Sequence, residues 1–328
     1  MLKTFATRVA ALASATVLWT SVGLPVANAL TSSDMSSTSS KGSSNGSSIS
    51  DAFTLSSKLG QALTMGNGTT THSTKQVSVS GQGTRSYELY VPSDYDSSRD
   101  YPVVFAYSGM DFDGSDMHGH SHFERATGSD AIVVYPNPRA SVNGGLAWEG
   151  PNYATTSRGE DVAFTKAILN DVANSYSVDR SRIYATGLSN GGGMALAAAC
   201  QAPETFAAVA GVSTAAYTRI FDGCTGQVPT LLIHGTDDKI APYYNDGSNG
   251  HGGSYYATRG AWERIGKRNA CDTSGASMRT GSGNGYNSFS YSGCLAETTL
   301  YRVNGGSHTW FASNPNATRE VWNFFQRH

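Results

Sequence analysis

A serine lies among glycines in the segment "IYATGLSNGGGMALAAAC" near the middle of the chain. Residues 187–191 read Gly-Leu-Ser-Asn-Gly, between an apolar, β-branched run and an alanine-rich run. In a strand–turn–helix arrangement, this pattern holds the serine in a strained backbone conformation that neighbouring glycines permit. The hydroxyl then stands at a helix N-terminus, where backbone N–H groups can stabilise a developing oxyanion. We therefore predict that Ser189 is a nucleophile; the alternative is a glycine-rich turn with an idle serine.

A nucleophilic serine needs a general base, and the base needs an acid that orients it. The apolar run in "PTLLIHGTDD" ends at Asp237 and Asp238, and the run in "LYRVNGGSHTW" is followed by His308. Among the later histidines, His251 lies in a glycine- and serine-rich stretch, and His328 is the last residue. The order serine, acid, histidine is that of α/β-hydrolases, which favours His308 as the base.

Three segments together, "RIYATGLSNGGGMA", "LLIHGTDDKIAPY" and "VNGGSHTW", resemble secreted esterases. The resemblance is to the polyhydroxybutyrate depolymerase and feruloyl or acetylxylan esterase group of the α/β-hydrolase superfamily, and it extends over about residues 80–327. It implies that Asp238 of the H-G-T-x-D motif is the acid and that His308 of the G-G-x-H-T-W motif is the base. Asp237 stays open as an alternative acid.

The oxyanion hole departs from the family pattern. The family usually carries His-Gly after its third strand, whereas "YPVVFAY" is followed here by Ser108-Gly109-Met110. The donor is a backbone amide and the glycine is kept, so we expect the amides of Met110 and Asn190 to form the hole. How the loop packs without the histidine is left open.

Apolar and β-branched runs alternate with helical patterns along the chain. The early runs follow one another through turns, as antiparallel strands do, and the later ones alternate with helices, as in a parallel sheet. We predict an α/β-hydrolase fold, with a mostly parallel central sheet and helices on both faces. The expected strands lie within residues 76–80, 85–92, 101–107, 131–136, 181–187, 206–212, 229–235 and 298–303, and the expected helices within 160–176, 255–268 and 318–327.

The N-terminal residues carry the pattern of a secretory signal. Lys3 and Arg8 precede an apolar run, and Ala27-Asn28-Ala29 fits a signal-peptidase site. We predict a signal peptide over 1–29, a serine-rich flexible linker over 30–75, and a catalytic domain over 76–328. A membrane anchor is disfavoured because the apolar run is short and interrupted by serine and threonine. The predicted location is extracellular.

The four cysteines lie in the predicted catalytic domain. An even number of cysteines in an exported chain favours disulfides, and we choose the pairing of sequence neighbours, Cys200–Cys224 and Cys271–Cys294. A structural zinc site is disfavoured because the C-x-x-C spacing is absent.

The charge pattern argues against nucleic acid as a partner. The formal net charge is -2, charged residues make up 15% of the chain, and no basic run is present. We expect an ester substrate, which could be polymeric, with no cofactor and no stable membrane insertion. The oligomeric state is left open.

A histidine-rich segment, "DFDGSDMHGHSHFE", follows the expected oxyanion loop. His118, His120 and His122 alternate, and on an extended segment they could point one way and bind a metal. Glycine and serine instead favour a solvated loop bordering the active site. We predict no catalytic metal, because the serine machinery is complete without one.

Two tryptophans are candidate substrate contacts. Trp148 lies in a loop after the strand at 131–136, and Trp310 lies beside the expected base. Sugar rings, ferulate and polyester chains stack on flat aromatic rings, although core packing is an equal alternative. Three functions remain: a feruloyl or acetyl esterase of polysaccharide, a polyhydroxyalkanoate depolymerase or envelope lipid esterase, and a non-catalytic binding protein with a hydrolase fold.

Overall fold

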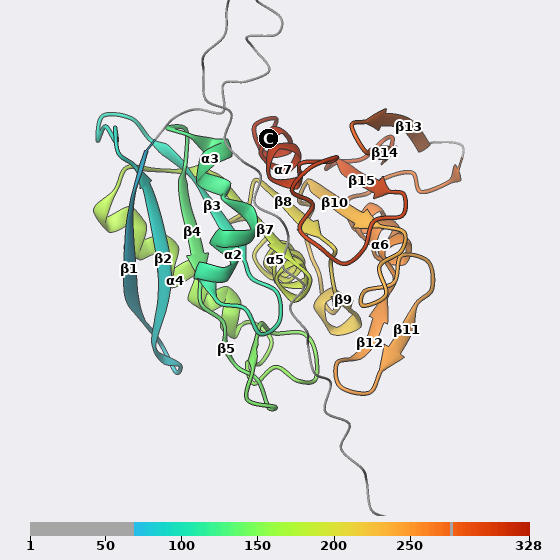
Figure 1. Ribbon diagram of the computed structural model, residues 1–328, viewed down its shortest axis with the longest axis horizontal. Coiled ribbons are helices and arrows are strands. Elements are labelled where there is room, and N and C mark those ends of the chain that lie inside the picture. Colours follow the sequence, from blue (N-terminus) through green and yellow to red (C-terminus); the bar gives the residue numbers. More distant parts are fainter. Residues whose placement is uncertain (1–68, 276–277) are drawn as a thin grey trace, which may run out of the picture. The chain divides into compact units, whose positions relative to one another are not determined.

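The computed structural model describes residues 69–275 and 278–328. The predicted signal peptide and residues 30–68 of the predicted linker lie outside the described residues. A ten-stranded sheet runs through the described chain (Figure 1). Its strands are β1 (Thr70–Val79), β2 (Gly83–Pro92), β3 (Tyr101–Tyr107), β4 (Ile132–Pro136), β7 (Val178–Leu188), β8 (Ala208–Val212), β10 (Thr230–Gly235), β13 (Met278–Gly283), β14 (Tyr286–Tyr291) and β15 (Thr298–Val303).

The strand order in this sheet is β1-β2-β4-β3-β7-β8-β10-β15-β14-β13. The six strands from β4 to β15 are mutually parallel, and antiparallel strands extend the sheet at both ends. The predicted mostly parallel sheet is confirmed. The hairpin of β13 and β14 was not predicted, because its exposed, glycine-containing first strand carries no apolar alternation.

Shorter strands complete the β-structure. One pair is formed by β5 (Arg139–Ala140) and β6 (Leu146–Ala147), and a three-stranded sheet by β9 (Ala216–Tyr217), β11 (Gly247–Asn249) and β12 (Gly253–Tyr256).

The folded part of the chain begins before the predicted boundary at residue 76. Strand β1 starts at Thr70 and pairs along its whole length with β2. Its first half is polar and largely exposed, so the backbone ladder orders a segment that the apolar pattern assigned to the linker.

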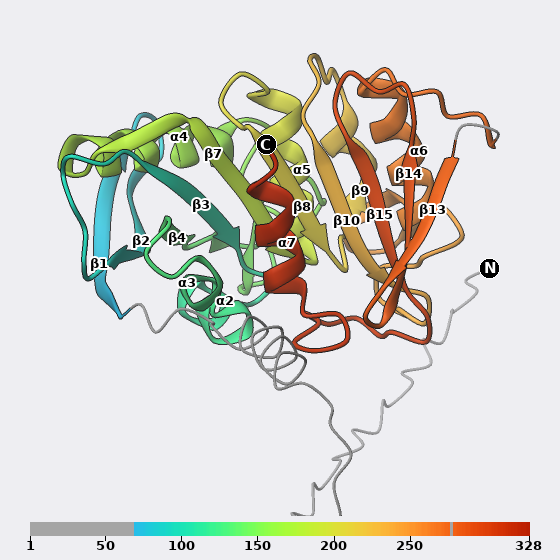
Figure 2. The same ribbon diagram turned by 90° about the horizontal axis from the view of Figure 1, so that it is seen from above.

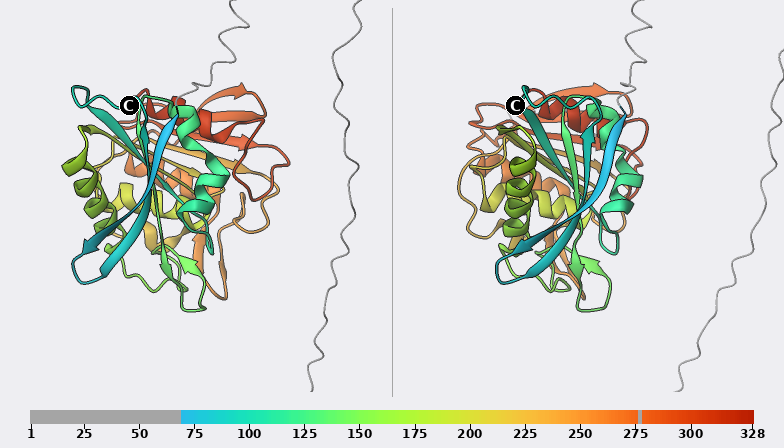
Figure 3. Two further views of the ribbon diagram at one scale, coloured as in Figure 1. Left: turned by 60° about the vertical axis from the view of Figure 1, so that its left-hand side comes forward. Right: turned by 90° about the vertical axis from the view of Figure 1, so that its left-hand side faces the viewer.

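Helices cover both faces of the ten-stranded sheet (Figure 2). Viewed from the β1 side, α4 and α2 flank the sheet on opposite sides (Figure 3). Along β3, Phe105 faces the cluster that includes α4, α5 and α6, and Val104 faces the cluster that includes α2, α3 and α7. The helices are α2 (Gly114–Ser121), α3 (Phe123–Thr127), α4 (Glu160–Ser175), α5 (Asn190–Gln201), α6 (Thr258–Arg268) and α7 (Ala317–Phe325), with a 3₁₀ turn, η1, at Thr218–Phe221.

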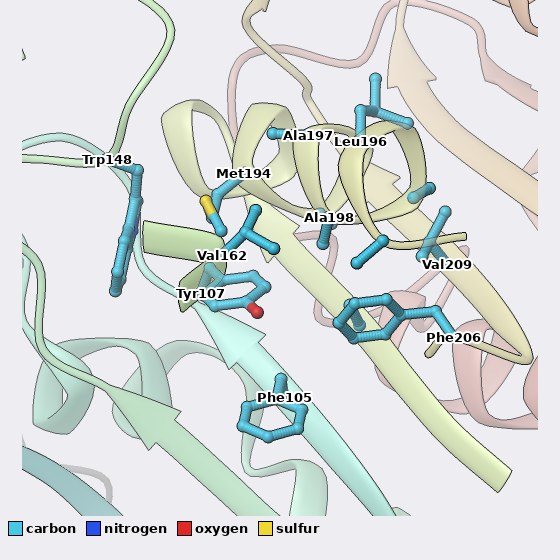
Figure 4. Packing of buried hydrophobic residues seen from close by; sticks show 14 of the residues in the cluster. Phe105, Tyr107, Trp148, Val162, Met194, Leu196, Ala197, Ala198, Phe206 and Val209 are labelled. Atoms are coloured by element: carbon cyan, nitrogen blue, oxygen red, sulfur yellow. The ribbon is translucent and has the colours of Figure 1, made fainter. Parts of the chain in front are cut away.

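Helix α5 is buried along nearly its whole length. Its alanines and glycines are small enough for the helix to approach the sheet closely. Met194 of this helix belongs to the same buried cluster as Tyr107 and Trp148 (Figure 4). Close packing on several sides fixes the position of the helix N-terminus, where Ser189 stands.

The histidine-rich segment is helical, so the predicted solvated loop is wrong. Residues 114–121 form α2, and Asp113 caps its N-terminus in a reciprocal pair of hydrogen bonds with Asp116. The cap compensates for two helix-weakening glycines. The histidines therefore follow a helical spacing and do not alternate along an extended strand.

Both predicted disulfides are present, and no free cysteine remains. Cys200–Cys224 joins the end of α5 to the loop after η1, and Cys271–Cys294 joins the segment after α6 to the loop before β15. None of the helices in the described part of the chain has the length and apolar character that spanning a bilayer requires.

Candidate active site

The turn between β7 and α5 holds Ser189 in an unusual backbone conformation. Its φ is 56° and its ψ is -117°, a region that residues other than glycine seldom occupy. The Ser189 amide donates to the Val212 carbonyl at 3.0 Å, and its carbonyl accepts from the amides of Gly193 and Ala215, both at 3.0 Å. These hydrogen bonds keep the Ser189 backbone in its strained conformation. The strained conformation itself is what the G-x-S-x-G pattern predicts.

Two glycines of this turn are required by contact. A Cβ at Gly187 would lie 2.3 Å from the Gly191 backbone, and a Cβ at Gly191 would lie 2.3 Å from the Tyr107 carbonyl oxygen. Real side chains do not approach backbone this closely. The serine can therefore sit at the tip only because the residues two positions before and after it, Gly187 and Gly191, have no side chains.

Asp238 and His308 meet at the same edge of the sheet. Asp238 follows β10 and His308 follows β15, and these parallel neighbours pair from Thr230 to Gly235. The Nδ1 atom of His308 lies 2.7 Å from Oδ2 of Asp238. The carboxylate is an acceptor, so Nδ1 carries the proton and Nε2 is the free basic nitrogen. Asp237 is exposed, and its amide donates to Gly306.

A second imidazole, not assigned to the site from the sequence, also contacts the Asp238 carboxylate. Nε2 of fully buried His234 lies 3.1 Å from Oδ2 of Asp238, and the amides of Ile240 and Ala241 donate to Oδ1 at 2.9 and 2.8 Å. Burial alone would raise the pKa of Asp238, but hydrogen bonds from two histidines and a backbone amide outweigh burial and hold this pKa well below its usual value. The carboxylate therefore stays ionised.

Ser213 joins the serine turn to the histidine loop. It follows Val212, whose carbonyl accepts a hydrogen bond from the Ser189 amide. The Ser213 hydroxyl donates to the Thr309 carbonyl at 2.9 Å and accepts from the Thr309 amide at 3.2 Å. Within the described residues, the Ser189 hydroxyl makes no hydrogen bond to His308. Catalytic hydrogen bonds are often long or poorly aligned until substrate binds, so this geometry does not rule out His308 as the base for Ser189.

The loop after β3 lies directly beside Ser189. A Cβ placed on Gly109 would lie 3.7 Å from the Ser189 Cβ. In the part of the chain that the structure describes, no group accepts a hydrogen bond from the Met110 amide. Two side chains secure the loop without the family's histidine: Trp148 Nε1 donates to the Ser108 carbonyl at 3.0 Å, and Ser108 Oγ donates to the Phe112 carbonyl at 2.7 Å.

Known proteins with a similar sequence are esterases. The esterase family model matches residues 78–282. "Probable feruloyl esterase C" of Aspergillus terreus is 30% identical over 285 residues, spanning 83% of this chain and 95% of that protein. Feruloyl esterase D of Neurospora crassa is 26% identical over 282 residues, spanning 83% and 90%. This chain belongs to the esterase family. It is a carboxylic ester hydrolase, which sets aside the non-catalytic alternative.

The fold of the esterase also has close solved counterparts. An acetyl xylan esterase from Aspergillus awamori aligns with a TM-score of 0.59 at 18% identity, covering 78% of this chain and 100% of that one. The predicted α/β-hydrolase fold is thus confirmed.

The prediction that Trp148 stacks on substrate is wrong. Its side chain is fully buried, with its ring edge against Tyr107 at 5.1 Å. The Asn190 side chain holds the Trp148 backbone from both sides, accepting from its amide at 2.8 Å and donating to its carbonyl at 3.3 Å. Trp148 therefore supports the loop after β3 from the core of the esterase and offers no free ring face.

Trp310 is also unavailable as a stacking surface. Only 4% of the residue is exposed, and its Nε1 donates to Thr318 of α7 at 2.9 Å. Proximity to His308 in sequence could not distinguish this anchoring role from substrate contact. Exposed apolar side chains near the candidate site are instead Met110 and Phe112, in the loop after β3, and Ile240, in the loop after β10.

Proposed function

We propose that this protein is a secreted serine esterase that hydrolyses feruloyl or acetyl esters of polysaccharide. The observation that carries the proposal is the 2.7 Å hydrogen bond between Asp238 and His308, at the sheet edge where strained Ser189 begins a buried helix. The names of the relatives, feruloyl esterases from several fungi, support the substrate class.

In the proposed reaction the Ser189 oxygen attacks the ester carbonyl carbon while His308 Nε2 takes the hydroxyl proton. The alcohol leaves with that proton, and the acyl group stays on the serine. Water then attacks the acyl carbon and gives a proton to the same nitrogen, which returns it to the Ser189 oxygen as the acid leaves. Asp238 keeps the His308 tautomer fixed and stabilises the imidazolium.

The oxyanion of both tetrahedral intermediates would be held by the amides of Met110 and Asn190. The Asn190 amide belongs to the first turn of α5, whose N–H groups have no partner within the helix. Losing one such donor typically costs about 2.7–4 kcal/mol of transition-state stabilisation.

Phe112 is the aromatic side chain best placed to meet an acyl ring. A Cβ on Gly109 would lie 3.5 Å from the Phe112 ring and 3.7 Å from the Ser189 Cβ, so this ring and the nucleophile flank one residue. The Phe112 residue is 38% exposed. An exposed ring beside the nucleophile suits a ferulate group better than it suits acetate.

Secretion is part of the proposal. The N-terminal signal pattern supports it, and so do the two disulfides, because such bonds persist in oxidising compartments.

The first test compares hydrolysis of p-nitrophenyl acetate and methyl ferulate by the mature protein and by Ser189→Ala. We expect turnover of both by the wild type, none by the variant, and fluorophosphonate labelling of the wild type alone. Activity that survives Ser189→Ala would overturn the serine mechanism. Cleavage of acetate alone would favour an acetyl or polyester substrate, which polyhydroxybutyrate hydrolysis would then separate.

Replacing Phe112 with alanine tests the aromatic contact. We expect kcat/KM for methyl ferulate to fall about tenfold, because a lost ring contact removes roughly 1–1.5 kcal/mol. The rate on p-nitrophenyl acetate changes less. The matched control is Leu295→Ala. Leu295 is exposed and precedes β15, so it lies at the end of the parallel strands opposite the candidate site. Equal losses on both esters would contradict the assignment.

A further inference from the structure

A cluster of potential metal ligands lies at the junction of α2 and α3, apart from the proposed catalytic residues. It consists of His118, His122 and Glu124, and we call it the α2–α3 cluster. The His118 and His122 positions are four apart, so α2 and its C-cap bring both rings to one side. One ligand atom from each of the three residues lies within 4.8 Å of the others.

Two distances in the α2–α3 cluster are close to those around a zinc ion. Zinc binds histidine nitrogen and carboxylate oxygen at about 2.0–2.2 Å, which places tetrahedral ligands about 3.3–3.5 Å from one another. His118 Nε2 lies 3.2 Å from Glu124 Oε1, and His122 Nδ1 lies 3.7 Å from the same oxygen. The ligand nitrogens of His118 and His122 lie within 4.8 Å of each other, so the two rings must move closer together to hold an ion.

One polar atom of the α2–α3 cluster has no hydrogen-bond partner inside the cluster or around it, within the part of the chain that is described. The His122 Nδ1 atom is buried and has no hydrogen-bond partner in the described residues. Burying an unpaired polar atom costs about 1–3 kcal/mol. A metal bond to Nδ1 would remove this cost.

The surroundings hold the ligands as an outer shell does in metal sites. Tyr135 donates to Glu124 Oε2 at 2.8 Å, which leaves Oε1 for the ion. The His118 ring stacks on Tyr90 at 4.5 Å and meets the Tyr135 ring edge-on at 5.5 Å. The ring orientations are therefore set by the sheet beneath α2.

We propose that His118 Nε2, His122 Nδ1 and Glu124 Oε1 bind one divalent ion, with water completing the coordination. Two imidazoles and a carboxylate favour Zn²⁺ among common ions. Both histidine side chains are partly exposed, so water can reach the ion. The ion joins the end of α2 to α3, both of which follow the loop after β3, and it takes no part in ester hydrolysis.

His120 is a natural internal control. It lies in the same helix, but its Nδ1 is 2.7 Å from the Asp116 carbonyl and its ring packs on Phe112 at 5.0 Å. It does not belong to the α2–α3 cluster. If His120 proved to be one of the metal ligands, the proposed ligand set would be wrong.

The test is calorimetric titration of ZnCl₂ into tag-free, chelator-treated mature protein. We expect one equivalent to bind and the Tm to rise. His122→Asn, which suits the left-handed backbone at this position (φ 42°), and His118→Phe, which keeps the stack on Tyr90, should each weaken binding at least tenfold. His120→Asn should bind as the wild type does.

Cobalt supplies a second readout, because Co²⁺ in a tetrahedral site absorbs strongly in the visible range. The wild type should show this absorption and His122→Asn should not. Absence of one-equivalent zinc binding, unchanged binding in His122→Asn, or lost binding in His120→Asn would each overturn the site.

If chelator treatment abolished ester hydrolysis, the non-catalytic role of the ion would be wrong. Loss of activity in Ser189→Ala bears only on the proposed mechanism. Should His118→Phe fail to fold, His122→Asn decides.

Discussion

At the scale of single residues, Asp238 is the most heavily bonded group of the candidate site. Its two oxygens accept from two imidazoles and two backbone amides. His308 uses one of these contacts to fix its tautomer, and His234 holds the carboxylate from the buried side. The same His234 nitrogen lies 2.8 Å from the Ala241 carbonyl, so we propose that this buried ring positions both the carboxylate and the chain that follows it.

Replacing Asp238 with asparagine should lower kcat for p-nitrophenyl acetate by about 10⁴-fold, because the amide favours the wrong His308 tautomer. KM should change little. Asp237→Asn is the matched control, since Asp237 is exposed and has no bond to His308; we expect its rate to stay within about twofold. Steady-state kinetics on both variants measures the difference. A larger loss in Asp237→Asn would reverse the assignment of the acid.

Acid stability also depends on Asp238. Its native pKa lies below the unfolded value of about 3.9, so the unfolded chain binds this proton more readily. The stability that Asp238 contributes is fully present above about pH 5 and is lost as the pH falls toward the native pKa. Between about pH 3 and 5, the free energy of unfolding should rise with pH more steeply in the wild type than in Asp238→Asn. Urea unfolding measures both slopes, and equal slopes would refute this role.

At the scale of elements, the strand–turn–helix unit of β7 and α5 depends on close backbone approach. Gly191→Ala would place a methyl carbon 2.3 Å from the Tyr107 oxygen and 2.4 Å from the Ser108 oxygen. We expect unfolding free energy to fall by about 1–3 kcal/mol, with loss of ester hydrolysis, because the turn must shift.

The matched control for this substitution is Gly119→Ala in α2. Nothing lies within 4 Å of a Cβ at Gly119, which has ordinary helical backbone. There the substitution should stabilise by up to about 1 kcal/mol. Thermal unfolding of both variants tests the pair; destabilisation of similar size at both positions would exclude backbone contact as the cause.

At the scale of the whole molecule, a buried ion pair connects β2 to α4 and to the loop that carries Trp148. Arg85 Nη1 donates to Asp161 at 2.6 Å, and the guanidinium lies 3.7 Å from the Phe164 ring centre. The second Asp161 oxygen accepts from the Glu149 amide at 2.7 Å. This network places the loop that carries Trp148 against the sheet, and through the Trp148 bond to Ser108 it also places the loop after β3.

Arg85→Met should lower the free energy of unfolding by about 3–5 kcal/mol, because it leaves the Asp161 charge buried without its partner. Arg99→Met is the control: Arg99 pairs with Asp130 at the surface, where the expected loss is below about 1 kcal/mol. Chemical denaturation of both variants measures the contrast. Similar losses would show that the buried charge is compensated by its other hydrogen bonds.

Structural features that depend on residues close together in the chain can be predicted from the amino-acid sequence. The serine turn depends on glycines within a few positions of Ser189, and the strands and principal helices depend on apolar periodicity over short windows. The two disulfides each join cysteines of the same local region. The order of motifs along the chain favoured His308, and the resemblance to the esterase group implied Asp238; these two side chains do form a hydrogen bond.

Other features depend on residues that meet only when the chain folds. Trp148 and Trp310 lie in sequence stretches typical of binding loops. Trp148 is held by Asn190, which is remote in sequence, and Trp310 is held by Thr318, which belongs to α7. The contact of His234 with the acid requires the bend after β10. The pairing of His118 with His122, excluding His120, follows from the helical spacing of α2, which glycine-rich composition concealed. Local sequence sets backbone preference, whereas burial and side-chain partners are set by contacts between distant elements, so these features required the tertiary structure.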